Sequence, residues 1–200
     1  MKRITIIILM FTTTLSFSQI TKDGFVLVKG WNQKGDFAIT NEWKQENSLT
    51  RAKSFLLKNV LGTNNNVLKF SLSPLEDSKS GELTTLIYKC EELNKSGMIL
   101  SFWGDYWNEY GVIYKGYDFK NLEKEQAILF LNKIQSIIDE NLEYLREDSN
   151  NNNISFEFDD MQIVITSYVG YKIRVFWNGF DSTWDWKAFE NTKEKFDEKI

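Results

Sequence analysis

Residues 121–147 read NLEKEQAILFLNKIQSIIDENLEYLRE, and this stretch decides how the fold is interpreted. Apolar residues recur in it at three- and four-residue steps, the spacing of one face of an α-helix. Asn121 is placed to cap the first turn, in which Glu123 and Glu125 complement the helix dipole. A helix of this length would span about 40 Å, so we expect it to bend or end near Asn141. The apolar stripe consists of Ala127, Phe130, Leu131, Ile134, Ile138, Leu142 and Leu145.

The sequence that follows this helix has a period of two. A polar connection at residues 149–153 leads into residues 154–159, where apolar and polar side chains alternate, and residues 171–178 repeat the alternation. Such alternation is typical of half-buried antiparallel strands. Residues 161–168 lie between these two segments, and Gly170 marks the turn to the last strand.

The N-terminal half predicts further strands and a short helix. Helical spacing is satisfied by Leu83, Leu86, Ile87, Cys90 and Leu93, but a strand is favoured by Thr84, Thr85, Ile87 and Tyr88. We choose a strand over residues 83–93, followed by a turn at 94–97. The other expected elements are a hairpin of 25–31 with 36–40, a helix over 48–61 ended by Gly62, strands at 67–75, 98–103 and 111–119, and a final helix over about 185–198.

Grouped strands followed by helices predict an α+β fold. We expect an antiparallel sheet of meander strands, with the long helix at about 121–147 and the C-terminal helix packed on one face. A weak echo, Gly116-Tyr117-Asp118 and Gly179-Phe180-Asp181, hints at a repeated unit of two strands and a helix. Three matching positions arise easily by chance in a chain rich in glycine and aromatic residues, so a duplication is the less favoured interpretation.

The N-terminus has the features of a cleavable export signal. Lys2 and Arg3 supply a positive start, and residues 4–11 form an apolar block. This block is about half of the ~20 residues that a membrane-spanning helix needs, so we expect no permanent membrane anchor. Ser16 and Ser18 are small residues at the third and first positions before a cleavage point after Ser18.

We therefore expect a signal peptide over residues 1–18, a single α+β domain over 19–200, and a periplasmic or secreted location. Removal of the signal takes away two basic residues and no acidic one, which leaves 22 Lys and Arg against 28 Asp and Glu, a formal charge of −6. This acidic balance, without a cluster of basic residues, argues against a nucleic-acid partner.

The chain lacks the residues that many catalytic mechanisms need. It has no histidine, which removes Ser-His-Asp and Cys-His catalysis and nearly every transition-metal site. Cys90 is the only cysteine, so no intrachain disulfide forms, and without a histidine beside it we expect a buried thiol. The nucleotide- and calcium-binding loop motifs are also missing. We expect no cofactor and no metal, and we favour a non-catalytic protein.

Two aromatic segments carry the candidate ligand-binding residues. Residues 103–110 read WGDYWNEY and residues 177–186 read WNGFDSTWDW. We interpret both as surface turns, where rings beside Asp and Asn are suited to sugar binding: the rings stack under the pyranose and the polar groups bind its hydroxyls. The side chains expected to contact a ligand are Trp103, Asp105, Trp107, Asp181, Trp184 and Trp186.

Three functional hypotheses follow from these features. The first is a non-catalytic binding module of the cell envelope that recognises a glycan or a protein. The second is an inhibitor or immunity-type protein of the periplasm, suggested by small size, acidity and export. The third is a carboxylate-based glycoside hydrolase using Asp105, Glu109 or Asp181, which would need two carboxyl groups about 5 to 9.5 Å apart across one cleft.

Overall fold

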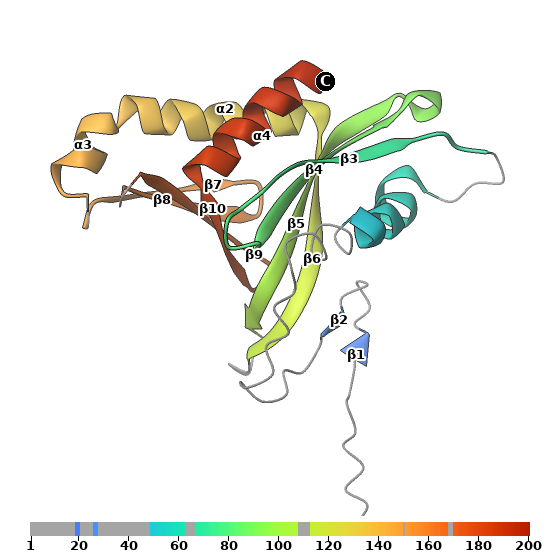
Figure 1. Ribbon diagram of the computed structural model, residues 1–200, viewed down its shortest axis with the longest axis horizontal. Helices are drawn as coiled ribbons and strands as arrows, with labels where there is room; N and C mark the ends of the chain where they lie inside the picture. The colour runs from blue at the N-terminus through green and yellow to red at the C-terminus, as the bar shows by residue number, and fades with distance from the viewer. Residues whose placement is uncertain are drawn as a thin grey trace, which may run out of the picture.

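The computed structural model describes residues 49–62, 67–107, 113–149, 151–167 and 170–200, together with two short strands, β1 (Gln19–Ile20) and β2 (Val26–Leu27) (Figure 1). β1 and β2 pair in antiparallel register. Of the expected hairpin at 25–31 and 36–40, only β2 falls within the described residues, and the expected signal peptide lies outside them.

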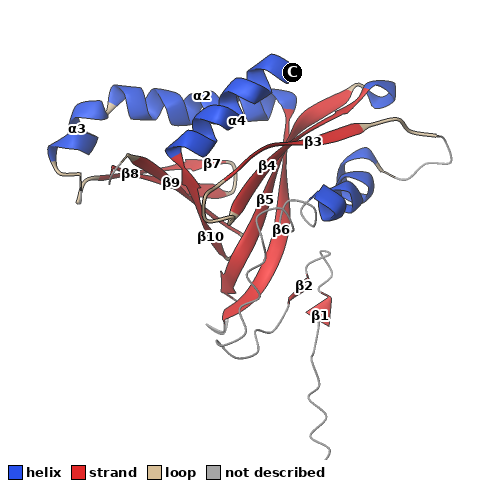
Figure 2. Cartoon of the chain, in the orientation of Figure 1, coloured by secondary structure: helices blue, strands red, loops and turns tan. Residues whose placement is uncertain are grey.

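The α+β class is confirmed, and the same order of elements occurs twice (Figure 2). In each unit four antiparallel strands pair in chain order before a helix. The first unit contains β3 (Ser71–Asp77), β4 (Leu83–Cys90), β5 (Lys95–Trp107), β6 (Ile113–Glu123) and α2 (Lys124–Glu140), which is followed by α3 (Leu142–Glu147). The second contains β7 (Asn153–Phe158), β8 (Met161–Ser167), β9 (Tyr171–Trp177), β10 (Phe180–Asp185) and α4 (Trp186–Lys199).

The two units join at the C-terminal end of β5, where Phe180 of β10 pairs with Tyr106. Glu82 reinforces this joint because its carboxylate accepts a hydrogen bond from the Thr183 amide at 2.8 Å, and its carbonyl accepts one from the Trp103 amide at 2.8 Å. The units therefore form one continuous sheet that is branched at β5, since β6 also pairs with β5.

The predicted echo does not mark equivalent places in the two units. Gly116 lies inside β6 opposite Gly104, whereas Gly179 belongs to the two-residue turn between β9 and β10. In both units the helix starts directly after the last strand, at an acidic N-cap, Glu123 or Asp185. Gly116 lies seven residues before Glu123, whereas Gly179 lies six residues before Asp185. The two similar tripeptides therefore do not occupy equivalent positions when the strands and helices of the two units are aligned.

The long helix packs its apolar stripe on one face of the sheet, as predicted. Its buried residues are Ala127, Phe130, Leu131, Ile134 and Ile138, and Leu145 is buried in α3. The expected break is confirmed at Asn141, whose side-chain amide donates to the Ile137 carbonyl at 2.8 Å. The predicted cap is wrong: Asn121 pairs with Ile99 inside β6, and Glu123 forms a capping box with Gln126.

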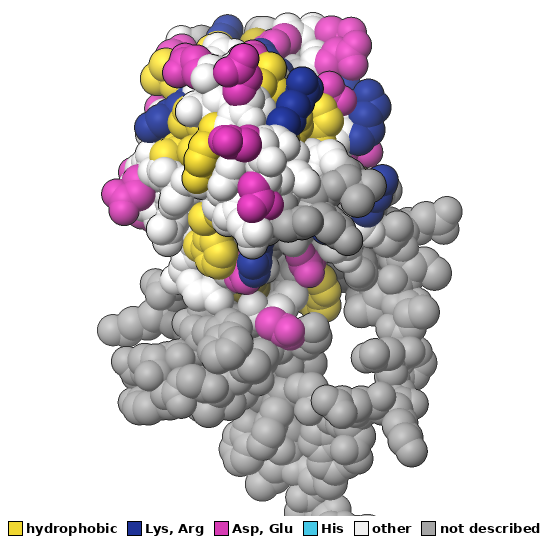
Figure 3. All heavy atoms as spheres, turned by 90° about the vertical axis from the view of Figure 1, so that its left-hand side faces the viewer, with side chains coloured by type: hydrophobic (Ala, Val, Ile, Leu, Met, Phe, Trp, Pro, Cys, Tyr) yellow, Lys and Arg dark blue, Asp and Glu magenta, His cyan; other side chains and the backbone are white. Residues whose placement is uncertain are grey.

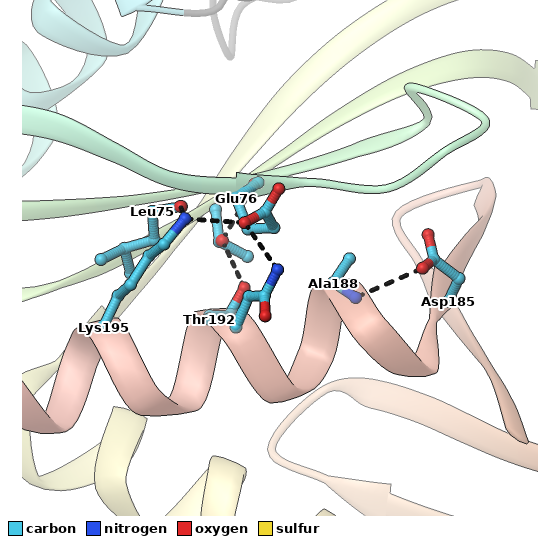
Figure 4. Close-up of polar contacts among 8 residues, drawn as sticks. Leu75, Glu76, Asp185, Ala188, Thr192 and Lys195 are labelled. Carbon is cyan, nitrogen blue, oxygen red and sulfur yellow. Dashed lines mark hydrogen bonds and ion pairs between the residues drawn. The ribbon is translucent and has the colours of Figure 1, made fainter.

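Helix α4 covers the same face beside α2 and is fixed to the first unit by polar contacts (Figure 4). Lys195 donates to the Glu76 carboxylate and to the Leu75 carbonyl, both at 2.7 Å. The buried Thr85 and Thr192 hydroxyls are 2.8 Å apart. Burial acts to raise the pKa of Glu76, but hydrogen bonds from Lys195 and Asn191 outweigh it and lower that pKa. These contacts attach the helix of the second unit to the edge of the first.

A third helix covers the opposite face of the first unit. Residues 49–55 are α-helical and continue into the π-helical η1 (Leu56–Leu61), which ends at Gly62 with φ 77°, as predicted. Figure 1 shows this segment, coloured cyan, across β4–β6 from α2 and α4. It buries Ala52, Leu56 and Leu61 in a second core cluster with Leu86, Tyr88, Cys90, Ile99 and Phe119.

Burial on both faces explains the ambiguous pattern of residues 83–93. The strand is confirmed over Leu83–Cys90. Side chains on both faces of this strand are buried, so apolar and polar residues do not alternate along it. Glu91–Leu93 form a short 3-10 turn, η2, instead of extending the strand. The turn expected at 94–97 is confined to Asn94, which reverses the chain with φ 49°, because Lys95 already begins β5. Cys90 is buried as a free thiol.

Candidate functional site

The expectation that the first aromatic segment forms a surface turn is wrong over residues 103–107, which continue β5. Trp103 is half-buried and Asp105 is exposed, and strand alternation places both on the face opposite to α2. The Trp107 side chain and residues 108–110, which include Glu109, lie outside the described residues.

The second segment is also a strand instead of a surface turn. Asn178 and Gly179, with φ 46° and 82°, form a two-residue hairpin turn, so β10 begins immediately at Phe180. Trp184 points into the core and is 1% exposed, with its ring 5.2 Å from that of Phe189. It therefore cannot contact a ligand in this fold.

Trp186 and Asp181 are half-buried and already have partners. The Trp186 ring lies 5.3 Å from that of Tyr171 and stacks on that of Phe189 at 5.2 Å. The Asp181 carboxylate accepts hydrogen bonds from the Arg174 Nε, at 2.9 Å, and from its Nη2. Of the predicted tryptophans with a described side chain, Trp103 alone lies outside the hydrophobic core clusters.

Asp105 and Asp181 come together at the joint between the units. They are the residues next to the paired Tyr106 and Phe180, and in antiparallel register such neighbours face each other across the strands. The bidentate contact of Asp181 with Arg174 is typical of a structural ion pair. Arg174 thus holds the Asp181 carboxylate in place across β9 and β10.

A groove that the sequence did not predict lies between helix 49–61 and β6. It has a volume of about 240 Å³, and Arg51, Phe55 and Lys58 line it from one face of the helix. Tyr117 lines it from β6 and is the cross-strand partner of Trp103, so the two rings share a face of the sheet. The complete lining is Thr50, Arg51, Ser54, Phe55, Lys58, Asn59, Tyr117, Asp118 and Phe119.

Aromatic rings form the floor of this groove. The Tyr117 and Trp103 rings stack at 6.3 Å with 17° between their planes, and Phe119 meets Tyr117 edge-on at 5.8 Å. Phe55 lies 5.4 Å from Phe119 and closes the floor from the helix side. The Arg51 guanidinium carbon lies 4.1 Å from the centre of the Tyr117 ring, within the range of a cation–π contact.

The groove is basic although the chain is acidic. Helix 49–61 carries Arg51, Lys53 and Lys58 and no acidic residue. Neither Arg51 nor Lys58 takes part in any ion pair among the residues that the structure describes. The carboxylate of Asp118 accepts hydrogen bonds from Asn178 Nδ2 and from the Phe119 amide, both at 2.7 Å, so it is already engaged.

The opposite end of the molecule lacks such a bias. Figure 3 shows the face formed by α3, β7 and β8, over which acidic, basic and apolar side chains are interspersed. The exposed Tyr144 belongs to α3 and stands outside the aromatic groove. The basic, aromatic surface beside helix 49–61 is thus a distinct local feature.

A second polar cluster ties β6 to the turns of the second unit. Lys120 Nζ donates to Asp159 at 2.6 Å and also to Asp160, and the Trp177 indole N–H donates to Asp160 at 3.0 Å. Burial acts to lower the pKa of Lys120, but its two carboxylate partners raise it overall. Burial acts to raise the pKa of Asp160, and the hydrogen bonds from Lys120 and Trp177 lower it overall. Each of these four side chains has a hydrogen-bond partner within the cluster, which is typical of a structural network.

The remaining chemistry of the described chain is limited. Within those residues, His, Cys, Asp and Glu side chains do not gather in groups of three that could hold a metal ion. None of the helices in the described ranges is long and apolar enough to cross a membrane. Comparison of the chain with protein-family models, curated proteins and solved structures finds no match.

Proposed function

We propose that this chain is an exported, non-catalytic binding protein whose ligand is a glycan held in the groove between helix 49–61 and β6. The observation that carries the proposal is the Tyr117 ring in the lining of an open hollow, with the Trp103 ring stacked beside it and the Arg51 guanidinium group over it. Flat rings supply the apolar surface on which a pyranose packs, and neighbouring donors bind its hydroxyls.

The polar groups of the groove suit binding better than catalysis. Arg51, Lys58 and Asn59 provide hydrogen-bond donors, and Thr50 and Ser54 provide hydroxyl groups. The only carboxylate among the lining residues is that of Asp118, which already accepts two hydrogen bonds. The described groove therefore offers no pair of free carboxyl groups for acid–base chemistry on a sugar.

The export part of the proposal rests on the N-terminal sequence. The basic start, the short apolar block and the small residues Ser16 and Ser18 support removal of residues 1–18 and action of the 19–200 domain in the periplasm or outside the cell. N-terminal sequencing of the protein recovered from the producing cells is expected to start at Gln19. Recovery of the intact Met1 terminus from the cytoplasm would contradict export.

Binding of envelope polysaccharide to the mature protein tests the ligand site. Trp103→Ala and Tyr117→Ala are each expected to weaken retention on an affinity gel of that polysaccharide at least tenfold, since Tyr117 lines the groove and Trp103 supports its ring. Tyr144→Ala is the matched control, because Tyr144 is exposed on α3 and is expected to change nothing.

The outcome that counts against the proposal is equally specific. Unchanged retention of folded Trp103→Ala and Tyr117→Ala proteins would exclude the groove as the glycan site. An inhibitor-type role is the competing hypothesis, and it would be favoured if the same two variants instead lost a stoichiometric protein partner.

A further inference from the structure

We infer that the glycan recognised by the groove is an acidic one, whose sugar rings carry carboxylate groups bound by Arg51 and Lys58. The inference rests on the proposed function and adds the chemical class of the ligand. It is carried by the position of two basic side chains over an aromatic floor in a chain with an excess of acidic residues.

Arg51 is held at the groove by Tyr117 and keeps donors for an anion. Its guanidinium carbon lies over the Tyr117 ring, 4.1 Å from the ring centre. A stacked guanidinium still directs its N–H groups outward in its own plane, where they match the two oxygens of a carboxylate. Within the described residues the only interaction of Arg51 is this ring contact, so these donors have no carboxylate partner there.

Lys58 extends the basic surface along the helix. It lies seven residues after Arg51, which corresponds to about 10 Å of helix rise, and it lines the same hollow. A ligand that fills the groove between the two cations must extend beyond one anionic group. An oligosaccharide with a repeated carboxylate meets this requirement, whereas a single free anion does not.

A neutral glycan would leave this charge pattern unexplained. The acidic surface of the chain repels an acidic polymer in general, so a local basic patch is needed for one to approach. Arg51 and Lys58 line the groove against the single carboxylate of Asp118, and helix 49–61 carries no acidic residue. Hydroxyl groups alone would be served by neutral donors such as Asn59.

Calorimetric titration of the mature protein with a hexauronate from alginate and with maltohexaose tests the inference. The hexauronate is expected to bind, to bind at least tenfold more tightly than maltohexaose, and to weaken as salt is raised to about 0.5 M. Arg51→Gln and Lys58→Gln are each expected to weaken hexauronate binding about tenfold. Lys53→Gln is the matched control, because Lys53 is exposed on the same helix but does not line the groove.

Two results separate failure of the inference from failure of the proposed function. Equal binding of both saccharides, unaffected by Arg51→Gln and Lys58→Gln, would overturn the acidic ligand and leave glycan binding intact. Absence of binding by either saccharide, together with binding of a poly-glutamate peptide that depends on Arg51, would overturn both in favour of a protein ligand. Because the Lys58 side chain is exposed, Lys58→Gln keeps the test valid even if Arg51→Gln fails to fold.

Discussion

Tyr88 of β4 is the cross-strand partner of Gly97 in β5, and its phenol ring occupies the space that a side chain at residue 97 would need. A Cβ atom at Gly97 would lie 2.8 Å from the Tyr88 hydroxyl oxygen and 2.3 Å from the Leu122 carbonyl oxygen. Tyr88 is only 1% exposed, and this burial raises its pKa to about 12 although a hydrogen bond with Asn121 acts to lower it. The glycine thus permits an aromatic side chain to pack under helix 49–61.

Gly97→Ala is expected to lower the free energy of unfolding by about 2–3 kcal/mol, because the Leu122 carbonyl is part of the β5–β6 ladder and cannot move away cheaply. Urea unfolding followed by circular dichroism measures the change. Gly62→Ala is the control, since its Cβ would meet nothing within 4 Å and only its φ of 77° strains an alanine, which costs about 1 kcal/mol. A Gly97→Ala protein as stable as the Gly62→Ala protein would contradict the close packing.

The hydroxyl pair between β4 and α4 predicts non-additive effects. Thr85 Oγ1 donates to the Glu76 carbonyl at 3.1 Å and accepts from Thr192, so Thr85→Val removes two bonds and is expected to cost about 1–3 kcal/mol. Thr192→Val removes one bond and should cost less. The double variant should be less destabilised than the sum of the single variants, because it leaves no buried hydroxyl unpaired. Strict additivity in thermal unfolding would show that the pair is not coupled.

Substitution of Trp184 is expected to lower the free energy of unfolding more than substitution of Trp186, although the two residues are only two positions apart. Trp184→Ala empties a core position between the sheet and the helices and should cost about 3–5 kcal/mol, or prevent folding. Trp186 is half-buried at the start of α4, so Trp186→Ala should cost about half as much. Trp184→Phe keeps the protein folded for the comparison. Equal losses from Trp184→Phe and from an exposed Tyr144→Phe change would contradict the buried position of Trp184.

The Lys120 cluster predicts how stability changes with pH. Asp160 has a folded-state pKa below its usual 3.8, so its contribution is present above about pH 4 and is lost as the pH falls through the lowered value. Lys120 has a pKa raised above 10.5, so its contribution is present below that value and is lost as the pH rises through the raised one.

Asp160→Asn should therefore reduce the free energy of unfolding by about 1 kcal/mol near neutral pH. The difference from the unmodified protein should shrink below about pH 4, which urea unfolding at several pH values measures. Glu76, whose pKa is also lowered, contributes equally to both proteins, so the difference isolates Asp160. A difference that persists unchanged at pH 2 would contradict the ionic origin of the effect.

The parts of the fold that were predicted are those with a single buried face. The stripe of α2 and the alternation of β7 and β9 each expose one side to water, and the period of their apolar residues reports that directly. β4 is buried on both faces, so its apolar residues show no period, and only β-branched and aromatic content favoured a strand. The prediction of Asn121 as a cap is wrong because β6 runs without a loop into α2.

The candidate site was less predictable for a geometric reason. Trp103 was identified from its aromatic neighbourhood, but Trp184 shares that neighbourhood and is in the core, since a strand directs alternate residues to opposite faces. Arg51 and Tyr117 are 66 positions apart and meet only through the packing of helix 49–61 on β6. The one available signal is the basic, acid-free composition of residues 49–61, whose three basic residues are too dispersed along the sequence to form a cluster.

Titration of the ¹⁵N-labelled mature protein with hexauronate, followed by nuclear magnetic resonance, tests the groove most directly. The account predicts that the indole N–H signal of Trp103 and the Nε–H signal of Arg51 shift in a saturable manner, whereas the indole signal of the buried Trp184 stays in place. Saturable shifts confined to residues outside helix 49–61, β5 and β6, with Trp103 and Arg51 unmoved, would contradict it.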